Sequence, residues 1–252
     1  MEPPTVRIMT FNIRHALGLD GKVSLERVAR IIEPAEIVFL SEVDRYWLRS
    51  GLMDQPAALQ RLTGMPHAFF AAAVDLPGPS RQYGNLLLSR FPILRATAVP
   101  LPQAEGAEAR VMIEAQIDVE GEVWFVFGVH LGLDREERRL QLETVRARAA
   151  SVGDRRLLLG DFNAPPDAPE MEALASEGPM WVDALAGAPG TFPAWKPAVR
   201  IDHVLLSPGF AARLVRSGVE ESDASDHRPA WVDLRLSRPP GPPAHPPAGV
   251  RP

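Results

Sequence analysis

The chain has 252 residues, a formal net charge of −5 and no cysteine. This length fits one large domain with an extensive buried core, and the absence of cysteine excludes disulfide bonds and thiolate metal sites. The acidic balance argues against a protein that binds nucleic acid through a broad basic surface, although a local basic patch would not show in the total charge.

No apolar run approaches the roughly 20 residues that a membrane-spanning helix needs. The first residues, Met1–Thr5, lack the basic and apolar regions of a signal peptide. We therefore expect a cytoplasmic protein with no stable membrane insertion, and we expect it to be a monomer.

In chain order, the sequence predicts many short strands separated by a few helices. Apolar or alternating runs predict strands over residues 6–12, 36–42, 68–74, 83–89, 93–99, 110–119, 122–130, 157–159, 199–207, 214–219 and 229–236. Helical patterns, with Ser24 and Asp134 as N-caps, predict helices over residues 24–32, 56–62, 134–151 and 169–176. Glu120-Gly121 predicts a hairpin turn. This arrangement favours an α/β fold in which two packed sheets are flanked by helices.

The composition changes near the end of the chain. We predict that residues 5–237 form a single domain. Residues 238–252 are rich in proline and contain almost nothing apolar to bury, so we expect a disordered tail of polyproline character.

Polar side chains recur at the edges of the predicted strands. A single Asp or Asn at a strand end is more often a turn former than a ligand. Here five such edges carry residue types that bind hard cations or move protons, which favours a catalytic site. Asp161 and Asn163, at i and i+2, point the same way from an extended chain. The residues concerned are Asn12, Glu42, His130, Asp161, Asn163, Asp226 and His227.

These residue types suit the hydrolysis of a phosphate ester by a metal-activated site. Mg²⁺ takes few protein ligands, mostly carboxylates, and keeps water and phosphate oxygens. We expect Glu42 and Asp226 to bind the metal, with Asn12 adding an amide oxygen. Asp161 can take the proton of the attacking water. Asn163 can hold the phosphate or that water.

Histidines can then stabilise the charge that develops on the phosphate. His227 and His130 are candidates to donate hydrogen bonds to its non-bridging oxygens. Asp202 lies inside an apolar strand, where an unpaired carboxylate is costly, and it can orient one imidazole by accepting its Nδ1–H. His203 follows it directly and therefore points to the other face, where we expect a structural role.

Six segments, in the same order along the chain, resemble the motifs of the endonuclease/exonuclease/phosphatase superfamily, which has the deoxyribonuclease I-like fold. The resemblance covers about residues 6–236. The matching segments are Thr10-Phe11-Asn12, Leu40-Ser41-Glu42-Val43, Val129-His130, Gly160-Asp161-Phe162-Asn163, Arg200-Ile201-Asp202-His203-Val204 and Ser225-Asp226-His227-Arg228-Pro229.

The resemblance implies a four-layer sandwich of two mostly antiparallel sheets flanked by helices. It also implies hydrolysis dependent on Mg²⁺ or Mn²⁺, without a covalent intermediate. In this family, Glu42 and Asp226 would touch the metal, His227 the scissile phosphate, and Asp202 would orient a histidine.

Two departures from the family pattern bear on function. In deoxyribonuclease-like members, the strand written here as Tyr83-Gly84-Asn85 carries an acid that pairs with the first histidine. Here Asn85 is the nearest polar substitute, so His130 would lack that partner. We count Asn85 among the candidate substrate-binding residues. We also find no basic, aromatic-rich insertion of the kind with which abasic-site nucleases grip DNA.

The segment after Glu42 resembles the small bacterial hydrolases of the same superfamily. Three polar residues that follow Glu42 either line the substrate pocket or belong to a salt-bridged surface loop: Asp44, Arg49 and Gln55. Arg110 either holds a phosphate or is a solvated arginine. The loop from Arg14 to Asp20 lies close to Asn12 in sequence and is a further candidate.

We therefore expect a divalent-metal-dependent hydrolase that acts on a small-molecule or lipid-derived phosphoester. A DNA or RNA nuclease is the alternative enzyme, and nucleic acid is the less favoured partner. An inactive binding or scaffold protein of the same fold is the alternative from another class. The presence of every motif residue from Asn12 to His227 argues against it.

Overall fold

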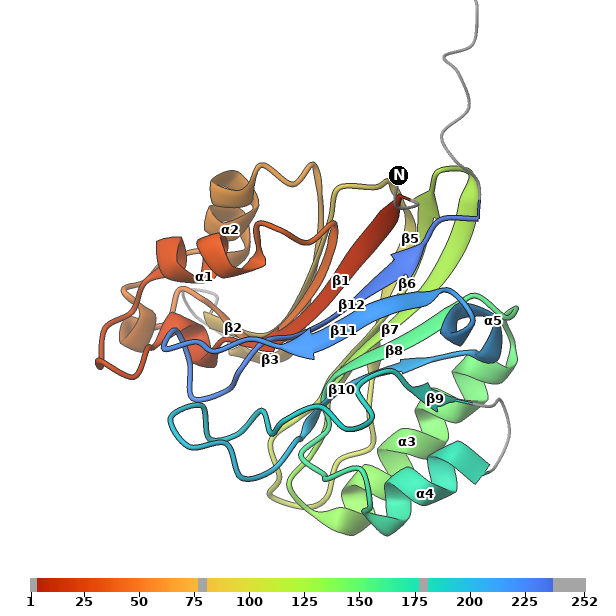
Figure 1. The fold of residues 1–252 in the computed structure, drawn as a ribbon. Helices are drawn as coiled ribbons and strands as arrows, with labels where there is room; N and C mark the ends of the chain where they lie inside the picture. The colour runs from red at the N-terminus through yellow and green to blue at the C-terminus, as the bar shows by residue number, and fades with distance from the viewer. Residues whose placement is uncertain (1–3, 77–80, 177–180, 238–252) are drawn as a thin grey trace, which may run out of the picture.

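Two six-stranded sheets pack face to face in the computed structural model, which describes residues 4–76, 81–176 and 181–237. Helices α1 and α2 cover the outer face of one sheet, and α3 and α4 cover the outer face of the other (Figure 1). This confirms the predicted α/β sandwich of two sheets flanked by helices. The predicted tail, residues 238–252, lies outside the described residues.

The first sheet has the strand order β11-β12-β1-β2-β4-β3. Only β1 and β2 pair in parallel, and the other neighbours are antiparallel. The strands are β1 (Thr5–Asn12), β2 (Ile37–Arg45), β3 (His67–Leu76), β4 (Arg81–Ser89), β11 (Leu214–Val219) and β12 (Ala230–Arg235).

The second sheet has the strand order β5-β6-β7-β8-β10-β9, again with one parallel pair, β7 and β8. Glu120 and Gly121 join β6 to β7 with positive φ angles of 53° and 85°, as a tight hairpin requires. The strands are β5 (Ile93–Pro100), β6 (Val111–Val119), β7 (Glu122–His130), β8 (Arg156–Asp161), β9 (Val182–Asp183) and β10 (Asp202–Leu206).

Four longer helices occupy the predicted positions, and Ser24 and Asp134 cap two of them through side-chain hydrogen bonds. They are α1 (Leu25–Ile32), α2 (Gln55–Thr63), α3 (Arg135–Ala150) and α4 (Pro169–Ser176). The predicted strand over 199–207 was too long, because Val199 bridges to Phe192 before β10 begins. The sequence does not predict β9 or three one-turn helices, because these elements are too short to show a period: η1 (Arg14–Ala16), η2 (Leu48–Ser50) and α5 (Pro208–Ala211).

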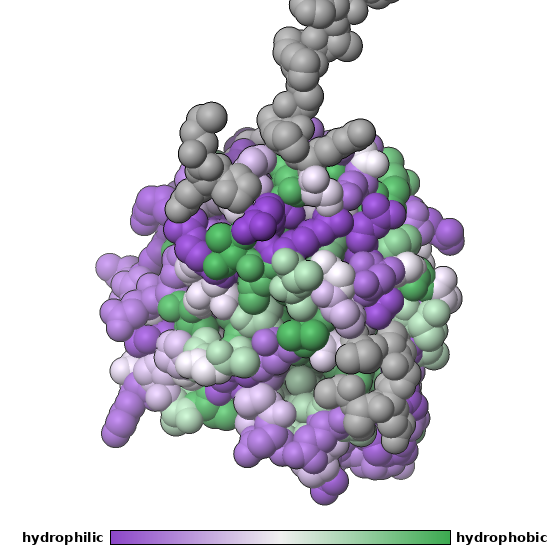
Figure 2. Space-filling model, turned by 45° about the vertical axis from the view of Figure 1, so that its right-hand side comes forward, coloured by the Kyte–Doolittle hydropathy of each residue, from purple (hydrophilic) through white to green (hydrophobic). Residues whose placement is uncertain are grey.

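Three apolar cores separate the four layers. Phe39 and Leu157 belong to the core between the sheets, Leu40 to the core under α1 and α2, and Leu158 to the core under α3 and α4. Neighbouring residues of β2 and β8 thus enter different cores, which explains their unbroken apolar runs. Each fully buried side chain of this size stabilises the fold by about 1.5–3 kcal/mol. Where Figure 2 shows the molecular surface, hydrophobic residues lie in small groups among hydrophilic ones.

The register of the strands brings the polar strand ends together. Asn12 at the end of β1 lies beside Ser41, which precedes Glu42 in β2. On the other sheet, Asp161 of β8 lies between His130 of β7 and Asp202 of β10. The two sheets therefore present their acids, amide and histidine at adjoining edges of the sandwich.

Gly160 sets the position of Asp161, and its replacement tests this geometry. Gly160 has φ of +142°, and a Cβ at this position would lie 1.8 Å from the carbonyl oxygen of Val129. We expect Gly160→Ala to destabilise the fold by about 3 kcal/mol or more, because a backbone clash is added to an unfavourable φ. Urea unfolding measures the loss.

Gly121→Ala is the matched control for this prediction. Its φ is +85°, but no atom lies within 4 Å of the added Cβ, so it should cost only about 1–2 kcal/mol. Equal losses for the two variants would show that the close approach of Val129 does not constrain Gly160.

Candidate active site

Asn12 links the two sheets at the centre of the site. Its Nδ2 donates to Glu42 Oε1 and to Asp161 Oδ2, both at 2.9 Å. Its Oδ1 accepts from the backbone N–H of Arg14 at 3.1 Å. The amide therefore bridges two carboxylates that would otherwise repel each other. In this arrangement its oxygen is used by the chain, so its predicted role as a metal ligand stays a prediction.

Glu42 has a left-handed backbone conformation, which residues other than glycine rarely adopt. Its φ is 59°, and it lies in an irregularity of the β2–β4 pairing between Leu40 and Val43. Burial, with Asp161 and Asp226 nearby, raises the pKa of Glu42 above its usual range, although the hydrogen bond from Asn12 opposes this shift. The site thus gathers negative charge that a cation would stabilise.

Asp161 is almost fully buried and is approached from several sides. Its Oδ1 accepts from the backbone N–H of Asn163 at 2.9 Å, and Asn163 itself has φ of 50°. Asn163 Nδ2 donates to the carbonyl of Leu131 at 2.9 Å. These contacts hold Asp161 and Asn163 in one turn, with the amide anchored by its nitrogen rather than its oxygen.

His227 is oriented by Asp202. Its Nδ1 donates to Asp202 Oδ2 at 2.9 Å, and its Nε2 lies 3.7 Å from Asp161 Oδ2. The ring of Phe192 packs against the imidazole at 4.9 Å between centroids. Burial disfavours the imidazolium, but the carboxylates of Asp202, Asp161 and Asp226 outweigh it and raise the pKa of His227 to about 10. This geometry suits a proton donor facing a phosphate oxygen.

His130 has a different environment. Its Nε2 lies 3.6 Å from Asp161 Oδ2, and its Nδ1 lies 3.3 Å from Nη1 of Arg110. Burial and Arg110 lower the pKa of His130 to about 3. Asn85, the nearest polar substitute for the expected acid, donates its Nδ2–H to the carbonyl of Val111 at 2.8 Å.

Arg110 and Asp44 lie behind the site rather than on its surface. The Arg110 side chain is only 7% exposed, and its Nη1 also donates to Glu108 Oε1 at 2.6 Å. Asp44 is fully buried, and Arg49 donates to both of its oxygens at 2.8 and 2.9 Å. Arg49 is 45% exposed. Of the Asp44–Arg49 pair, only Arg49 can reach a substrate, and the salt bridge of the alternative interpretation is present as well.

Two neighbouring donor groups could hold a divalent cation. Asp161, Asp202 and His227 each offer a ligand atom, and these atoms lie within 4.8 Å of one another. Asp202 and His227, however, are hydrogen-bonded to each other and would have to exchange that bond for a metal. In the second group, carboxylate oxygens from Glu42 and Asp226 suit Mg²⁺ or Mn²⁺, and the hydrogen bond between His227 and Asp202 can stay intact. Because burial penalises the charge of Glu42 beside Asp161 and Asp226, the donor set fits a bound cation.

Two further residues approach the site. Arg14 belongs to the loop that the sequence named as a further candidate. Its Nε lies 3.4 Å from Asp226 Oδ2, in a turn where Arg14 and His15 both have φ of 46°. Without glycine, the sequence gives no signal for such a turn. Tyr83 is buried beside Glu42 and Arg110. Burial is the largest cause that raises the pKa of its hydroxyl group, and the charge of Glu42 adds to it. Its position depends on tertiary packing that local pattern does not reveal.

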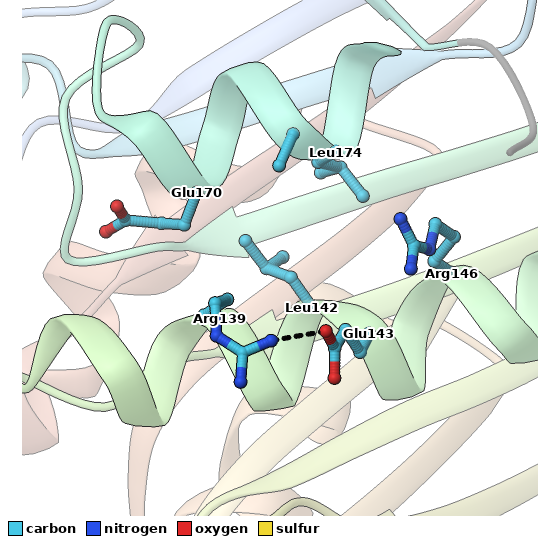
Figure 3. A pocket seen from close by; sticks show the side chains of 7 residues that line it. Arg139, Leu142, Glu143, Arg146, Glu170 and Leu174 are labelled. Atoms are coloured by element: carbon cyan, nitrogen blue, oxygen red, sulfur yellow. Dashed lines mark hydrogen bonds and ion pairs between the residues drawn. The ribbon is translucent and has the colours of Figure 1, made fainter. Parts of the chain in front are cut away.

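A separate groove lies on the outer layer, between α3 and α4 (Figure 3). Arg139 pairs there with Glu143 and with Glu136. None of the lining residues belongs to the site described above, so we assign this groove no role. No helix of the described part of the chain has the length and apolar character needed to cross a membrane.

A family model agrees with this arrangement. The model described as the Endonuclease/Exonuclease/phosphatase family matches residues 9–227. A solved structure of an endonuclease/exonuclease/phosphatase from Beutenbergia cavernae is 28% identical, with a TM-score of 0.78, and the match covers 93% of this chain and 72% of that chain. Among curated proteins, the search finds no match. The resemblance seen in the sequence is confirmed.

More distant structures share the fold. A mannosyl-6-phosphatase from Bacteroides thetaiotaomicron is 18% identical, with a TM-score of 0.76 and coverage of 92% of this chain and 100% of that chain. Truncated TDP2 from Caenorhabditis elegans is 17% identical, with a TM-score of 0.66 and coverage of 92% and 98%. At these identities the likeness supports the deoxyribonuclease I-like sandwich and nothing finer.

His203 supports the site from behind β10. It is fully buried, its Nδ1 lies 2.8 Å from Arg200 Nη1, and its Nε2 lies 2.9 Å from the carbonyl oxygen of Ala164. The neutral imidazole with its proton on Nε2 satisfies both partners. Burial and Arg200 lower the pKa of His203 to about 4.

This shift predicts a loss of stability in mild acid. The folded pKa lies below the unfolded value of about 6.5, so stability is present above pH 6.5 and falls as the pH drops toward 4. At pH 5 the loss from His203 should be about 2 kcal/mol. We expect His203→Gln, which cannot be protonated, to lose about that much less between pH 7.5 and pH 5 in urea unfolding. Equal losses in the two proteins would contradict a neutral buried His203.

Proposed function

The chain belongs to the endonuclease/exonuclease/phosphatase family, and we propose that it hydrolyses a phosphoester with the help of Mg²⁺ or Mn²⁺. One observation carries the proposal. The carboxylates of Glu42, Asp161 and Asp226 and the imidazoles of His130 and His227 converge on one small space at the edge of the sandwich.

Each residue has a role that its contacts support. Glu42 and Asp226 would hold the cation, which when bound would act as a Lewis acid on the phosphoryl oxygen. Asp161 would accept the proton of the attacking water. His227, oriented by Asp202, would donate to a non-bridging phosphate oxygen. Asn163 would position the water or the phosphate beside Asp161.

A small or lipid-derived phosphoester is the substrate class that we propose. The arginines near the site are paired with acids: Arg14 with Asp226, Arg49 with Asp44, and Arg110 with Glu108. A nuclease needs a positive track several nucleotides long, with binding that weakens steeply as salt rises. These paired arginines supply little free positive charge, so nucleic acid stays the less favoured substrate.

Arg49 is the residue that we propose for substrate contact. A buried carboxylate fixes its guanidinium through two hydrogen bonds, and nearly half of its side chain is exposed. A preorganised guanidinium loses little freedom when it binds an anionic or polar group. Large apolar side chains are also exposed, at Leu48 beside Arg49 in η2 and at Leu133 and Trp195 elsewhere. They would suit a substrate with an apolar portion.

A phosphoester panel tests the function directly. It should include bis-(p-nitrophenyl) phosphate, sugar phosphates, inositol phosphates, sphingomyelin, nucleotides and oligonucleotides, each with Mg²⁺, with Mn²⁺ and with chelator. Hydrolysis of a small or lipid phosphoester that stops with chelator supports the proposal. Hydrolysis confined to oligonucleotides would favour the nuclease. Correctly folded protein that neither binds Mn²⁺ nor hydrolyses any member would favour the scaffold alternative.

Replacement of Glu42 tests the metal site. We expect Glu42→Gln to weaken Mn²⁺ binding at least tenfold in calorimetry and to reduce activity most at limiting Mg²⁺, because the amide removes the ligand charge. Glu143→Gln, in the groove between α3 and α4, is the matched surface control. Unchanged activity of the Glu42 variant at limiting Mg²⁺ would contradict its assignment as a ligand.

Replacement of Asp161 tests the general base. Asp161→Asn keeps the shape of the side chain but cannot accept the proton, so kcat should fall on the order of 10²–10⁴-fold. Mn²⁺ affinity should change less than in the Glu42 variant. A loss of kcat below tenfold would assign proton transfer to another group.

The monomeric state and the cytoplasmic location stay predictions.

A further inference from the structure

We infer that Arg110 is a positioning residue that holds His130 as a neutral imidazole with its proton on Nε2. In this role the His130 ring accepts at Nδ1 and donates a hydrogen bond through Nε2–H. The catalytic part of this inference rests on the proposed function; the protonation state of the ring does not.

Hydrogen-bond chemistry at Nδ1 carries the inference. Nη1 of Arg110 lies 3.3 Å from His130 Nδ1, and both side chains are buried. Every nitrogen of a guanidinium carries hydrogen, so the group can only donate. The contact is therefore a hydrogen bond only if Nδ1 accepts, and a neutral ring then carries its proton on Nε2. That atom faces Asp161 Oδ2 at 3.6 Å.

The two histidines beside Asp161 thus have opposite partners. His227 Nδ1 donates to the carboxylate of Asp202, whereas His130 Nδ1 accepts from the guanidinium of Arg110. The low pKa of His130 agrees with this division.

A second pair in the same chain shows the same arrangement without a role in the chemistry. Arg200 Nη1 lies 2.8 Å from His203 Nδ1, and His203 Nε2 faces the carbonyl oxygen of Ala164 at 2.9 Å. A carbonyl can only accept, so Nε2 of His203 must donate. This pair fixes what an Arg-held histidine should look like in a spectrum and serves as an internal reference.

Glu108 allows a buried arginine to lie beside His130. Arg110 donates through Nη1 to Glu108, which keeps the buried cation paired. Asn85 Nδ2 donates to the carbonyl of Val111, the residue after Arg110, and so ties the backbone beside Arg110 to β4.

The protonation state can be measured without an activity assay. Two-bond ¹H–¹⁵N spectra of protein labelled in histidine distinguish a protonated from an unprotonated Nδ1, and His130→Gln and His203→Gln assign the signals. At neutral pH, without added metal, we expect unprotonated Nδ1 for both rings. Arg110→Met should change the His130 signal and leave that of His203, and Arg200→Met should do the reverse.

Two outcomes would overturn the inference. One is a protonated Nδ1 in His130 of the unaltered protein, and the other is an Arg110→Met spectrum in which His130 is unchanged. If Arg110→Met does not fold, the spectrum of the unaltered protein alone still decides between an accepting and a donating Nδ1. Neither result depends on whether the protein proves to be a phosphoesterase.

Activity variants then test the role of the ring. The amide N–H of glutamine can replace a donating Nε2–H but cannot release a proton as an acid. We expect His130→Gln to keep at least tenfold more kcat than His130→Ala. Arg110→Met should lower kcat on the order of 10–100-fold, with partial recovery in Arg110→Lys. Equal losses in His130→Gln and His130→Ala would contradict a donor role.

Discussion

The bridge that Asn12 makes between Glu42 and Asp161 joins the two halves of the structure. Glu42 lies in the irregularity of β2 in one sheet, and Asp161 lies at the end of β8 in the other. At both positions burial raises the cost of charge. One amide group donates to both carboxylates, so the sheets are joined where their acids would otherwise repel. The same contact sets the distance between the proposed metal ligand and the proposed base. Any change in the packing of the sheets would therefore alter both roles together.

Asp161 is where this constraint passes to the histidines. Its Oδ2 accepts a hydrogen bond from Asn12 Nδ2. The Nε2 atoms of His130 and His227 lie 3.6 and 3.7 Å from the same oxygen. The second partners of the two rings make them different: a carboxylate orients one and a guanidinium the other. Two imidazoles that face one carboxylate thereby differ in the group that each Nδ1 contacts. The distinction arises behind the site, among residues that a substrate does not touch.

The sequence predicted the strands, the longer helices and the meeting of polar strand ends, because each rests on local periodicity or on an end that must be polar. It also predicted the family and hence the four layers. It could not predict the partners of Arg110, Asp44 and Asn85, because these depend on side-chain directions across the core. Nor could it predict the left-handed backbone at Glu42 and Asn163, since no glycine marks either position. Asp44 illustrates this limit. It follows the proposed metal ligand Glu42 by two residues, which suggested a pocket residue, yet both oxygens of its carboxylate accept hydrogen bonds from Arg49.

Four of the eight non-glycine residues with positive φ in the described chain lie near the proposed chemistry. Arg14, His15, Glu42 and Asn163 all have positive φ and all lie within a few residues of the strand ends that carry the site. Each such residue costs about 1–3 kcal/mol, and the cost persists only where the surrounding structure offsets it. Three apolar cores supply that offset here, and the strands on both sides of the site are buried on both faces. The rigid interior thus allows Glu42 to leave the regular pairing of β2 and turn toward Asn12, which a more loosely packed sheet would not hold in place.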